Sequence, residues 1–377
     1  MAKEWRFGIV GTGTVGEWHV RVTPKVPGAT LVALCDVVPD KAHKAAEKNG
    51  LAGVPVYDSI EAMLAKEDLD VVTVCTPSGN HLEPLLTAIK AGKNVISEKP
   101  LEIKLDRLDQ IVEAAKAKGV KLAGIFQNRW NEANRALRDA AQEGRFGRIA
   151  WAGSFTPWHR TDQYYRDGGW RGTWKLDGGG AIMNQSVHAV DLLQWIVGPV
   201  KSVSAYASSR IHAEIEVEDT LSASLEFANG GYGTIMGTTA MYPGQAVRIE
   251  VGGEDGTGVS ENGLKVFKFR DERPGDQALL EQFAPQPSDI WKERLTKAGG
   301  DPLLEQLGLK GKASTAGGAS ATDVGLDLHG KNLDAILRSW DAGQEAETAG
   351  PEARKAVAII VAMYESARKG GMPIRVE

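Results

Sequence analysis

The segment that most constrains the fold of this chain is Gly11-Thr12-Gly13-Thr14-Val15-Gly16. It follows an apolar run at Phe7–Val10 and precedes a stretch with a helical pattern, which is the setting that G-x-G-x-x-G requires in a βαβ unit. There the glycines allow a tight turn and a close approach of the backbone to a pyrophosphate, and the N–H groups that open the helix face the phosphates. The segment therefore predicts a dinucleotide site whose phosphates are held by Gly11, Thr12, Gly13, Thr14 and Val15.

Asp36 indicates which dinucleotide binds. It ends the next apolar run, about 20 residues after the last glycine, where an acidic side chain accepts the ribose hydroxyls of NAD and repels the 2′-phosphate of NADP. No arginine follows closely, and the nearest cation after Asp36 is Lys41. We therefore expect NAD rather than NADP.

Short apolar runs alternate with helical patterns through the first third of the chain. Strands are expected at Phe7–Val10, Leu31–Cys35, Val54–Tyr57, Val71–Cys75, Asn94–Ser97 and Lys121–Ile125, and helices at Lys41–Lys48, His81–Ala91 and Leu105–Lys118. This alternation predicts an α/β domain with a parallel sheet covered by helices on both faces. We expect this NAD-binding Rossmann domain to span residues 1–126.

Strands follow one another without intervening helices in much of the remaining chain. They are expected at Ile149–Phe155, Val200–Ser208, Thr220–Phe227, Tyr232–Thr239 and Ala246–Val251, with helices at Asn131–Glu143, Leu328–Trp340 and Glu352–Arg368. Residues 127–377 are therefore expected to form an α+β domain with an antiparallel sheet. Arg270–Asp327, rich in glycine, proline and charge, is expected to be irregular and receives no role.

The composition excludes several classes of protein. Lys and Arg number 44 against 49 Asp and Glu, and the net charge of −5 argues against a nucleic-acid binder. No apolar run reaches the roughly 18 residues of a membrane helix, and the run near the N-terminus is too short for a signal peptide. Cys35 and Cys75 lie in apolar runs and indicate reduced thiols, so we expect a cytoplasmic protein. The histidines show no metal-ligand spacing with thiols or carboxylates, so no metal site is expected.

Lys99 is the first candidate for chemistry. It lies between Glu98 and Pro100, directly after the strand expected at Asn94–Ser97. Proline fixes its own φ and restricts the residue before it, so Lys99 is held on a stiff backbone. Ligands of open α/β sheets bind beyond the carboxyl ends of the strands, which is where Lys99 lies.

A second polar segment, Thr76-Pro77-Ser78-Gly79-Asn80-His81, also follows a strand. Its position predicts contacts with the cofactor from Thr76, Pro77, Asn80 and His81. A plain turn with a helix cap from Asn80 explains the same residues, because asparagine often caps helices. For His81 alone, a helix cap and a contact with the cofactor are equal alternatives.

The segment Gly178–Leu193 is expected to carry the reacting groups. Three glycines at 178–180 predict a close backbone approach with a helix starting after them. On that helix Asn184, His188 and Asp191 are spaced i, i+4 and i+7, which places them on one face. Histidine is the natural proton carrier near neutral pH. A hydrogen-bonded core histidine is the alternative for His188.

Aromatic and cationic residues crowd the loop before this helix. They are Trp158, His159, Arg160, Tyr164, Tyr165, Arg166, Trp170, Arg171 and Trp174. Aromatic rings stack on sugar faces and arginines hold anionic groups, so the cluster predicts a substrate wall. A packed loop with solvated charges is the alternative. Arg129 is expected to face the same pocket, whereas Asp219 is expected to be structural.

The chain resembles the Gfo/Idh/MocA family, the group of glucose–fructose oxidoreductase and inositol dehydrogenase. The resemblance rests on Gly11–Gly16, Glu98-Lys99-Pro100, Trp170–Trp174 and Gly178–Leu193. It implies a Rossmann domain plus a domain with a large, open, mostly antiparallel sheet that buries against another subunit, hence a homodimer or homotetramer. It also implies that Glu98, Lys99, Trp170 and Arg171 lie at the cofactor.

The resemblance further implies that Lys99 and His188 flank the carbon that exchanges hydride. Many members carry aspartate where this chain has Asn184, and an asparagine cannot transfer a proton. The form Asn184-Gln185-x-x-His188 is similar to that of nucleotide-sugar 3-dehydrogenases.

The expected function is oxidation of a secondary hydroxyl of a sugar, sugar derivative or cyclitol by NAD. His188 is expected to act as the base, Lys99 to stabilise the developing charge and Asn184 to orient the substrate. Substrate contacts are expected from Lys99, Arg129, Trp158, Tyr164, Asn184 and His188. Two alternatives are a glycosidase that keeps its NAD and oxidises C3 transiently, and a non-enzymatic sensor of sugar or dinucleotide. Retention of Lys99 with His188 argues against the sensor.

Overall fold

The computed structural model describes residues 3–284 and 322–377. The chain divides into two compact units. Unit 1 comprises Met1–Trp130, Thr173–Gly179 and Thr322–Val361, and unit 2 comprises Asn131–Gly172, Gly180–Ala321 and Ala362–Glu377. The expected division into domains at 1–126 and 127–377 stays a prediction.

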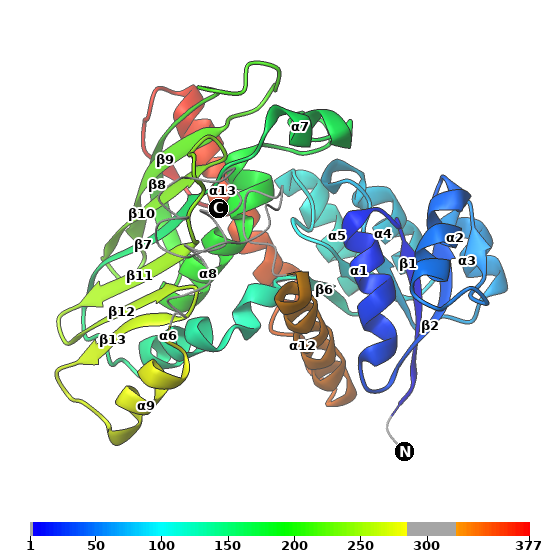
Figure 1. The fold of residues 1–377 in the computed structure, drawn as a ribbon, viewed down its shortest axis with the longest axis horizontal. Helices are drawn as coiled ribbons and strands as arrows, with labels where there is room; N and C mark the ends of the chain where they lie inside the picture. The colour runs from blue at the N-terminus through cyan, green and yellow to red at the C-terminus, as the bar shows by residue number, and fades with distance from the viewer. Residues whose placement is uncertain (1–2, 285–321) are drawn as a thin grey trace, which may run out of the picture. The chain divides into compact units, whose positions relative to one another are not determined.

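Unit 1 is built on a six-stranded sheet in the order β3-β2-β1-β4-β5-β6, and every neighbouring pair is parallel (Figure 1). Its strands are β1 (Trp5–Val10), β2 (Ala29–Cys35), β3 (Val56–Tyr57), β4 (Val71–Val74), β5 (Asn94–Ser97) and β6 (Leu122–Gly124). The strand order reverses between β1 and β4, and ligands of doubly wound sheets bind beyond the strand ends at such a point. The expected Rossmann fold is thus confirmed.

Helices cover this sheet in two groups. They are α1 (Thr14–Val22), α2 (Pro39–Lys48), α3 (Ile60–Lys66), α4 (Leu82–Lys90), α5 (Leu105–Lys118), α12 (Thr322–Asp341) and the first part of α13 (Gly350–Arg368). Helix α4 packs with α3 and α5, whereas α1 packs with α2 and α12. Short 3₁₀ turns lie at η1 (Thr23–Lys25), η2 (Ser78–Asn80) and η3 (Gln127–Trp130).

Helix α12 belongs to the core of unit 1 although it comes late in the chain. Leu333, Ile336 and Leu337 are buried in one cluster with residues of β1 and α1. The ring of Trp340 lies 5.6 Å from that of Trp5, whose Nε1 donates to Asp341 at 3.0 Å. This packing was not predicted: the helix expected at Leu328–Trp340 was assigned to the second domain.

Unit 2 is built on an eight-stranded sheet in the order β13-β12-β11-β7-β10-β9-β8-β14. Its strands are β7 (Ile149–Pro157), β8 (Val200–Ser208), β9 (Thr220–Phe227), β10 (Tyr232–Thr238), β11 (Arg248–Gly253), β12 (Gly256–Glu261), β13 (Leu264–Phe269) and β14 (Ile374–Arg375). All neighbours are antiparallel except β7 and β10, which run parallel. The expected α+β class with a mostly antiparallel sheet is confirmed.

Helices of unit 2 line one face of this sheet (Figure 1). They are α6 (Glu132–Gln142), α7 (Asp162–Gly168), the π-helix η4 (Ala181–Ser186), α8 (Val187–Val197) and α9 (Pro274–Gln282). Helix α8 packs on β7 and β11, and α6 packs on β12 and α8. The segment Arg270–Asp327 was expected to be irregular, but α9 and the first turns of α12 lie inside it, and its residues 285–321 lie outside the described residues.

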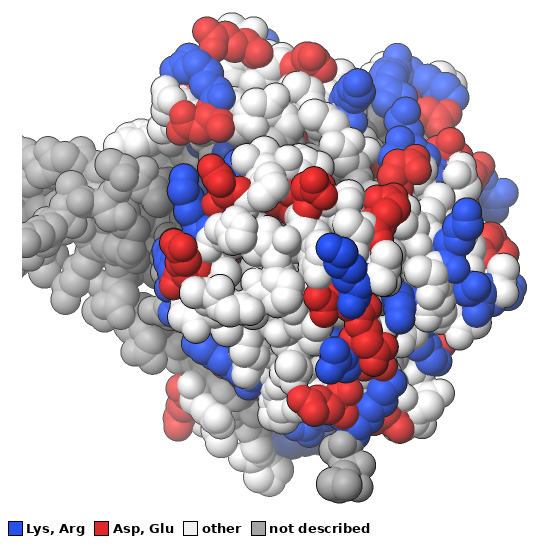
Figure 2. Space-filling view, turned by 90° about the vertical axis from the view of Figure 1, so that its right-hand side faces the viewer, with Lys and Arg blue, Asp and Glu red and all other residues white. Residues whose placement is uncertain are grey.

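Charges of both signs are interspersed on the face of the molecule shown in Figure 2, with no large area of one sign. Within residues 3–284 and 322–377, no helix combines the length and the apolar character needed to cross a bilayer.

A buried ion pair fastens α9 to the end of α6. Arg145 donates to both carboxylate oxygens of Asp276, at 2.7 and 2.6 Å, and its guanidinium lies 4.0 Å from the ring centroid of Phe269. The two side chains are only 8% and 10% exposed. The hydrogen bonds from Arg145 outweigh the effect of burial and lower the pKa of Asp276.

We expect Asp276→Asn to lower the free energy of unfolding by about 3 kcal/mol at pH 7, because Arg145 then stays buried without its carboxylate. A lowered pKa in the folded state stabilises the protein above the ordinary aspartate pKa, and this stabilisation is lost as the pH falls through the folded value. The difference in the free energy of unfolding between wild type and variant is therefore expected to have its full size above about pH 4 and to disappear below it. Urea unfolding across this range, with the exposed Asp271→Asn as control, measures it. A gap that is constant with pH contradicts the account.

Candidate active site

The three motif glycines of unit 1 have three different surroundings. Gly11 has φ +88°, and a Cβ there would lie 2.8 Å from the backbone of Cys75. A Cβ on Gly16 would lie 1.9 Å from the carbonyl oxygen of Gly11, so α1 packs directly on the turn. A Cβ on Gly13, the N-cap of α1, would meet nothing within 4 Å. The N-terminus of α1 is thus open at the residue where a pyrophosphate approaches, and the turn fits that group.

Asp36 is anchored to the same turn. Its Oδ2 accepts hydrogen bonds from Thr12 N at 2.8 Å and Thr12 Oγ1 at 2.9 Å, and its Oδ1 accepts one from Val38 N at 2.9 Å. The carboxylate is 9% exposed and lies just beyond β2. The acid and the glycine turn therefore form one preorganised structure.

The ring of His81 is held by backbone carbonyl groups of unit 1. Its Nδ1 lies 2.9 Å from Pro100 O, its Nε2 lies 2.9 Å from Thr76 O, and the ring is 1% exposed. Burial lowers its pKa. His81 is the N-cap residue of α4, the position that the helix-cap alternative gives it, although its side chain makes no cap hydrogen bond. The ring instead ties the Thr76 turn to the turn at Lys99, and a cofactor contact from His81 stays a prediction.

Lys99 lies two residues beyond β5, half-buried, with a cis peptide bond to Pro100. Its backbone N donates to Glu98 Oε2 at 3.1 Å. Glu98 Oε1 lies 2.7 Å from His19 Nε2 and 3.6 Å from His329 Nε2. Burial alone would raise the pKa of Glu98, but the hydrogen bonds from the two histidines outweigh it and hold this pKa well below the usual value.

The sequence analysis missed this group. One potential ligand atom from each of His19, Glu98 and His329 lies within 4.8 Å of the others, so the three residues could hold a metal ion. They come from α1, the turn after β5 and α12, and no local spacing reveals such a meeting. The 2.7 Å separation of His19 and Glu98 is that of a direct hydrogen bond.

The helix that carries Asn184 and His188, at residues 181–197, is called the reacting helix below. The glycines before it make the expected close approaches. Gly178 has φ +75°, and a Cβ there would lie 2.4 Å from Cβ of Ile103 within unit 1. A Cβ on Gly180 would lie 2.0 Å from the carbonyl oxygen of Glu218 within unit 2. The helix begins directly afterwards, at Ala181.

This helix does not begin as an α-helix. Ala181–Ser186 is a π-helix, and regular α-helix runs from Val187 to Val197. Asn184 therefore lies in the π-helical part, where α-helical spacing does not apply, and a face shared by Asn184 and His188 stays a prediction. His188 and Asp191 keep their i, i+3 relation inside α8. Single π-helical turns often occur at functional sites.

His188 differs from every other residue of α8. All other residues of this fully described helix are buried, whereas His188 is half-buried. Asn184 and Asp191 are 9% and 1% exposed. His188 is thus partly exposed on an otherwise buried helix, although its Nδ1 is buried, and this partial exposure does not fit the alternative of a fully enclosed core histidine.

The aromatic and cationic residues of unit 2 come together in part. The guanidinium of Arg160 lies 5.1 Å from the ring centroid of Trp158 and 4.9 Å from that of Tyr164. The guanidinium of Arg171 lies 4.3 Å from the same Tyr164 ring, and 5.6 Å from that of Trp170. Burial lowers the pKa of Arg160, and the charge of Arg171 adds to this effect.

Gln185 connects this cluster to the reacting helix. Its Oε1 accepts from Arg160 Nη2 at 2.8 Å, and its Nε2 donates to Tyr164 Oη at 2.8 Å. Gln185 was named from the sequence only as part of the form Asn184-Gln185-x-x-His188, without a role of its own. Trp174 is 41% exposed, and Arg166 pairs with Glu214 at the surface.

Arg129 has the contacts of a structural residue. It is fully buried, donates from Nη1 to Glu347 O at 2.9 Å and lies 5.8 Å from the ring centroid of Phe126. These contacts give no support to substrate binding by Arg129, which stays a prediction. Asp219, expected to be structural, accepts three backbone hydrogen bonds from Arg210, Ile211 and His212.

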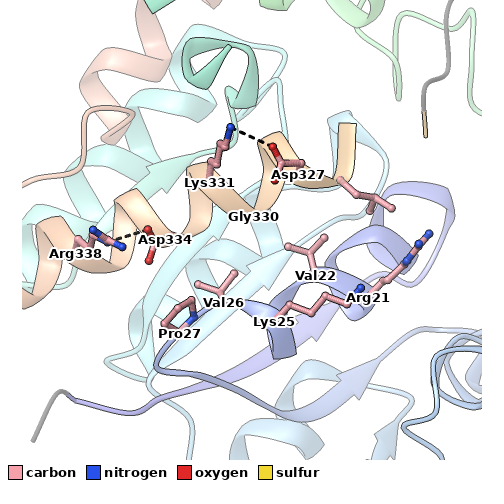
Figure 3. Close-up of a pocket in the computed structure, with 11 residues that line it drawn as sticks. Arg21, Val22, Lys25, Val26, Pro27, Asp327, Gly330, Lys331, Asp334 and Arg338 are labelled. Carbon is pink, nitrogen blue, oxygen red and sulfur yellow. Dashed lines mark ion pairs between the residues drawn. The ribbon is translucent and has the colours of Figure 1, made fainter. Parts of the chain in front are cut away.

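A cavity of about 440 Å³ lies elsewhere in unit 1 (Figure 3). Val22, Val26 and Pro27 line it on one side, and α12 lines it on the other with the ion pairs Lys331–Asp327 and Arg338–Asp334. None of the candidate site residues lines this cavity. This cavity is therefore separate from the glycine turn of unit 1 and carries none of the residues expected to bind the cofactor or the substrate.

Comparison with known proteins shows the family of this chain. Residues 5–126 match the family described as "Oxidoreductase family, NAD-binding Rossmann fold", and residues 134–259 match "GFO/IDH/MocA C-terminal domain". The chain is 32% identical over 227 residues to 1,5-anhydro-D-fructose reductase of Ensifer adhaerens, a match that spans 60% of this chain and 66% of that protein. It is 27% identical over 298 residues to Myo-inositol 2-dehydrogenase of Thermotoga maritima, spanning 77% of this chain and 86% of that protein.

A solved structure is similar along the whole chain. It is the WlbA dehydrogenase from Bordetella pertussis in complex with NADH and UDP-GlcNAcA, with 30% identity and a TM-score of 0.81. The match covers 100% of this chain and 99% of that one. The chain therefore belongs to the Gfo/Idh/MocA family of oxidoreductases, which carry an NAD-binding Rossmann fold.

Proposed function

We propose that this protein oxidises a secondary hydroxyl of a sugar, sugar derivative or cyclitol, with NAD as the hydride acceptor. The observation that carries the proposal is the accessible His188 on an otherwise buried helix that starts with a π-helical turn. The open glycine turn with its anchored Asp36 supports the cofactor. The family relationship supports the reaction class.

His188 removes the hydroxyl proton as general base, because it combines an imidazole with access to the outside of its helix. Lys99 donates a hydrogen bond to the same oxygen and stabilises the negative charge that develops there. Asn184 hydrogen-bonds the substrate without exchanging a proton, since its amide has no titratable group near neutral pH. The proton thus leaves through His188 alone.

The cofactor is held by the glycine turn, by Asp36 and by residues from several other segments. Gly11, Thr12, Gly13, Thr14 and Val15 hold the pyrophosphate and Asp36 the adenosine ribose. Further contacts come from Thr76, Pro77, Asn80, His81, Glu98, Lys99, Trp170 and Arg171. Bound NAD⁺ supplies the acceptor for the hydride of the substrate carbon.

The substrate is a carbohydrate that carries an anionic group. Arg160 and Arg171 flank the ring of Tyr164, and hydrogen bonds through Gln185 link this cluster to the segment of Asn184. Paired guanidiniums bind carboxylate or phosphate groups. The nucleotide sugar bound by the similar WlbA dehydrogenase supports this class of substrate. Trp158 and Tyr164 contact the same substrate.

An absorbance assay for NADH tests the reaction. UDP-GlcNAcA and myo-inositol are offered with NAD and, separately, with NADP, and 1,5-anhydro-D-fructose is offered with NADH. Net NADH from NAD supports the proposal, and a preference for UDP-GlcNAcA supports the anionic substrate. Product from glucosides without net NADH points instead to the glycosidase, and binding without turnover points to the sensor.

We further propose that the protein is a cytoplasmic homodimer or homotetramer that associates through the sheet of unit 2. The face of this sheet away from α6 and α8 exposes aromatic side chains, with Tyr206 70% and Tyr232 64% exposed. Exposed aromatic residues favour association. Light scattering coupled to gel filtration is expected to give a mass of two or four chains for the wild type and a smaller mass for Tyr232→Arg. A wild-type monomer contradicts the proposal.

A further inference from the structure

The start of the reacting helix is held by two residues that no motif assigned to the site, Glu218 and Tyr364. Glu218 Oε2 accepts from Gly180 N at 3.0 Å, and Glu218 Oε1 accepts from Ile182 N at 2.9 Å. The backbone oxygen of Glu218 accepts from Ala181 N at 3.0 Å. A single residue thus satisfies three consecutive N–H groups at a helix start, where these groups have no partner inside the helix.

Tyr364 completes the set. Its hydroxyl accepts from Met183 N at 3.3 Å and donates to Glu218 Oε1 at 2.8 Å. Four consecutive N–H groups, from residues 180 to 183, are therefore satisfied by Glu218 and Tyr364 together. Both side chains are only 4% exposed, so water does not substitute for these contacts.

The charge of Glu218 suits this position. A carboxylate is stabilised at a helix N-terminus by the positive end of the helix dipole. Burial raises the pKa of Glu218, and the hydrogen bonds from Ile182, Gly180 and Tyr364 oppose that rise. Gly180 is required for this contact, because its missing Cβ is what lets the Glu218 oxygen approach the turn.

Further contacts hold the π-helical turn itself. Ser186 Oγ donates to Ala181 O at 2.6 Å across the π-helical turn. A Cβ on Gly237 would lie 2.4 Å from Ser186 Oγ. Asn184 directly follows the four anchored N–H groups, and His188 is four residues further along the same continuous helix. A shift of the anchored turn would therefore move both side chains.

We propose that Glu218 and Tyr364 are positioning residues that fix Asn184 and His188 for catalysis through the start of the π-helix. This proposal rests on the proposed function of those two residues. We call Glu218 and Tyr364, with the four N–H groups that they hold, the clamp. A displacement of about 1 Å at a reacting group costs on the order of 100-fold in rate, so the clamp is expected to affect turnover more than binding.

The test compares Glu218→Gln and Tyr364→Phe with wild type. Glutamine keeps the shape but places an amide N–H against a backbone N–H, so we expect kcat to fall about 100-fold while the dissociation constant for NAD stays within about twofold. Phenylalanine removes one hydroxyl and is expected to lower kcat about tenfold. The double variant is expected to be no slower than Glu218→Gln, because both changes break one network.

Asp219→Asn is the matched control. Asp219 is the next residue, is equally buried and also accepts backbone N–H groups, but it holds the loop at Arg210–His212 instead of the helix. We expect its melting temperature to fall about as far as that of Glu218→Gln, with kcat within about threefold of wild type. Folded Glu218→Gln that turns over at the wild-type rate overturns the proposal, as does an equal loss of kcat in Asp219→Asn.

Hydrogen exchange separates this proposal from the proposed function. In the protein without substrate, the amides of residues 180–186 are expected to exchange faster in Glu218→Gln than in wild type, while those of β9 are unchanged. If no sugar gives turnover with the wild type but this exchange still accelerates, the clamp stands and the proposed function fails. Unchanged exchange at 180–186 overturns the clamp whatever the activity.

Discussion

Replacing Lys99 by alanine is expected to lower turnover by about 10²- to 10³-fold while NAD still binds. Removing one preorganised donor to a developing oxyanion costs rates of this order. The backbone at Lys99 is held by the hydrogen bond to Glu98 and by the peptide bond to Pro100, so truncating the side chain leaves the turn in place. Steady-state rates with the best sugar of the panel, and NAD titration by protein fluorescence, measure the two effects.

Lys90→Ala serves as the control for this prediction. Lys90 is an exposed lysine at the end of α4 and is expected to keep the wild-type rate. Lys99→Arg keeps the charge but changes the shape of the donor, and it is expected to recover part of the activity. Unchanged turnover in Lys99→Ala would remove Lys99 from the mechanism.

Replacing His188 by alanine is expected to lower turnover by 10²- to 10⁴-fold, the usual contribution of a general base. The same variant is expected to regain activity when imidazole is added to the buffer, because His188 is the accessible residue of its helix and its removal leaves room on that side. NAD binding is expected to stay unchanged. Initial rates against imidazole concentration measure the recovery.

His43→Ala is the control, since His43 is exposed on α2 and contacts no site residue. Imidazole is expected to have no effect on this variant or on wild type. A His188→Ala variant that keeps its rate, or that loses it together with NAD binding, contradicts the assignment of His188 as the base.

Local patterns predicted the regular elements well. The bounds of β5, α5, β8 and β9 agree with the expected Asn94–Ser97, Leu105–Lys118, Val200–Ser208 and Thr220–Phe227. Of these segments, α5, β8 and β9 have a clear apolar period and are followed by residues that favour turns. The strands β12 and β13 were not predicted, because β12 contains two glycines and carries a weak pattern.

The site was predictable only where its residues lie close in sequence. The glycine turn and the Asn184–His188 segment are local, and both were found. The π-helical turn depends on Glu218 and Tyr364, which contact it from far along the chain. The meeting of His19, Glu98 and His329 is likewise non-local. Single-sequence patterns carry no signal for such contacts.

Unit 1 is formed by three separate segments of the chain, and this affects how the protein folds during synthesis. Its N-terminal sheet leaves the ribosome long before α12, whose Leu333, Ile336 and Trp340 cover residues of β1 and α1. During synthesis this apolar surface stays without its cover until nearly the whole chain has been translated. An N-terminal fragment ending near residue 130 would therefore lack part of its own core, and expression of the nucleotide-binding half alone would yield an aggregation-prone product.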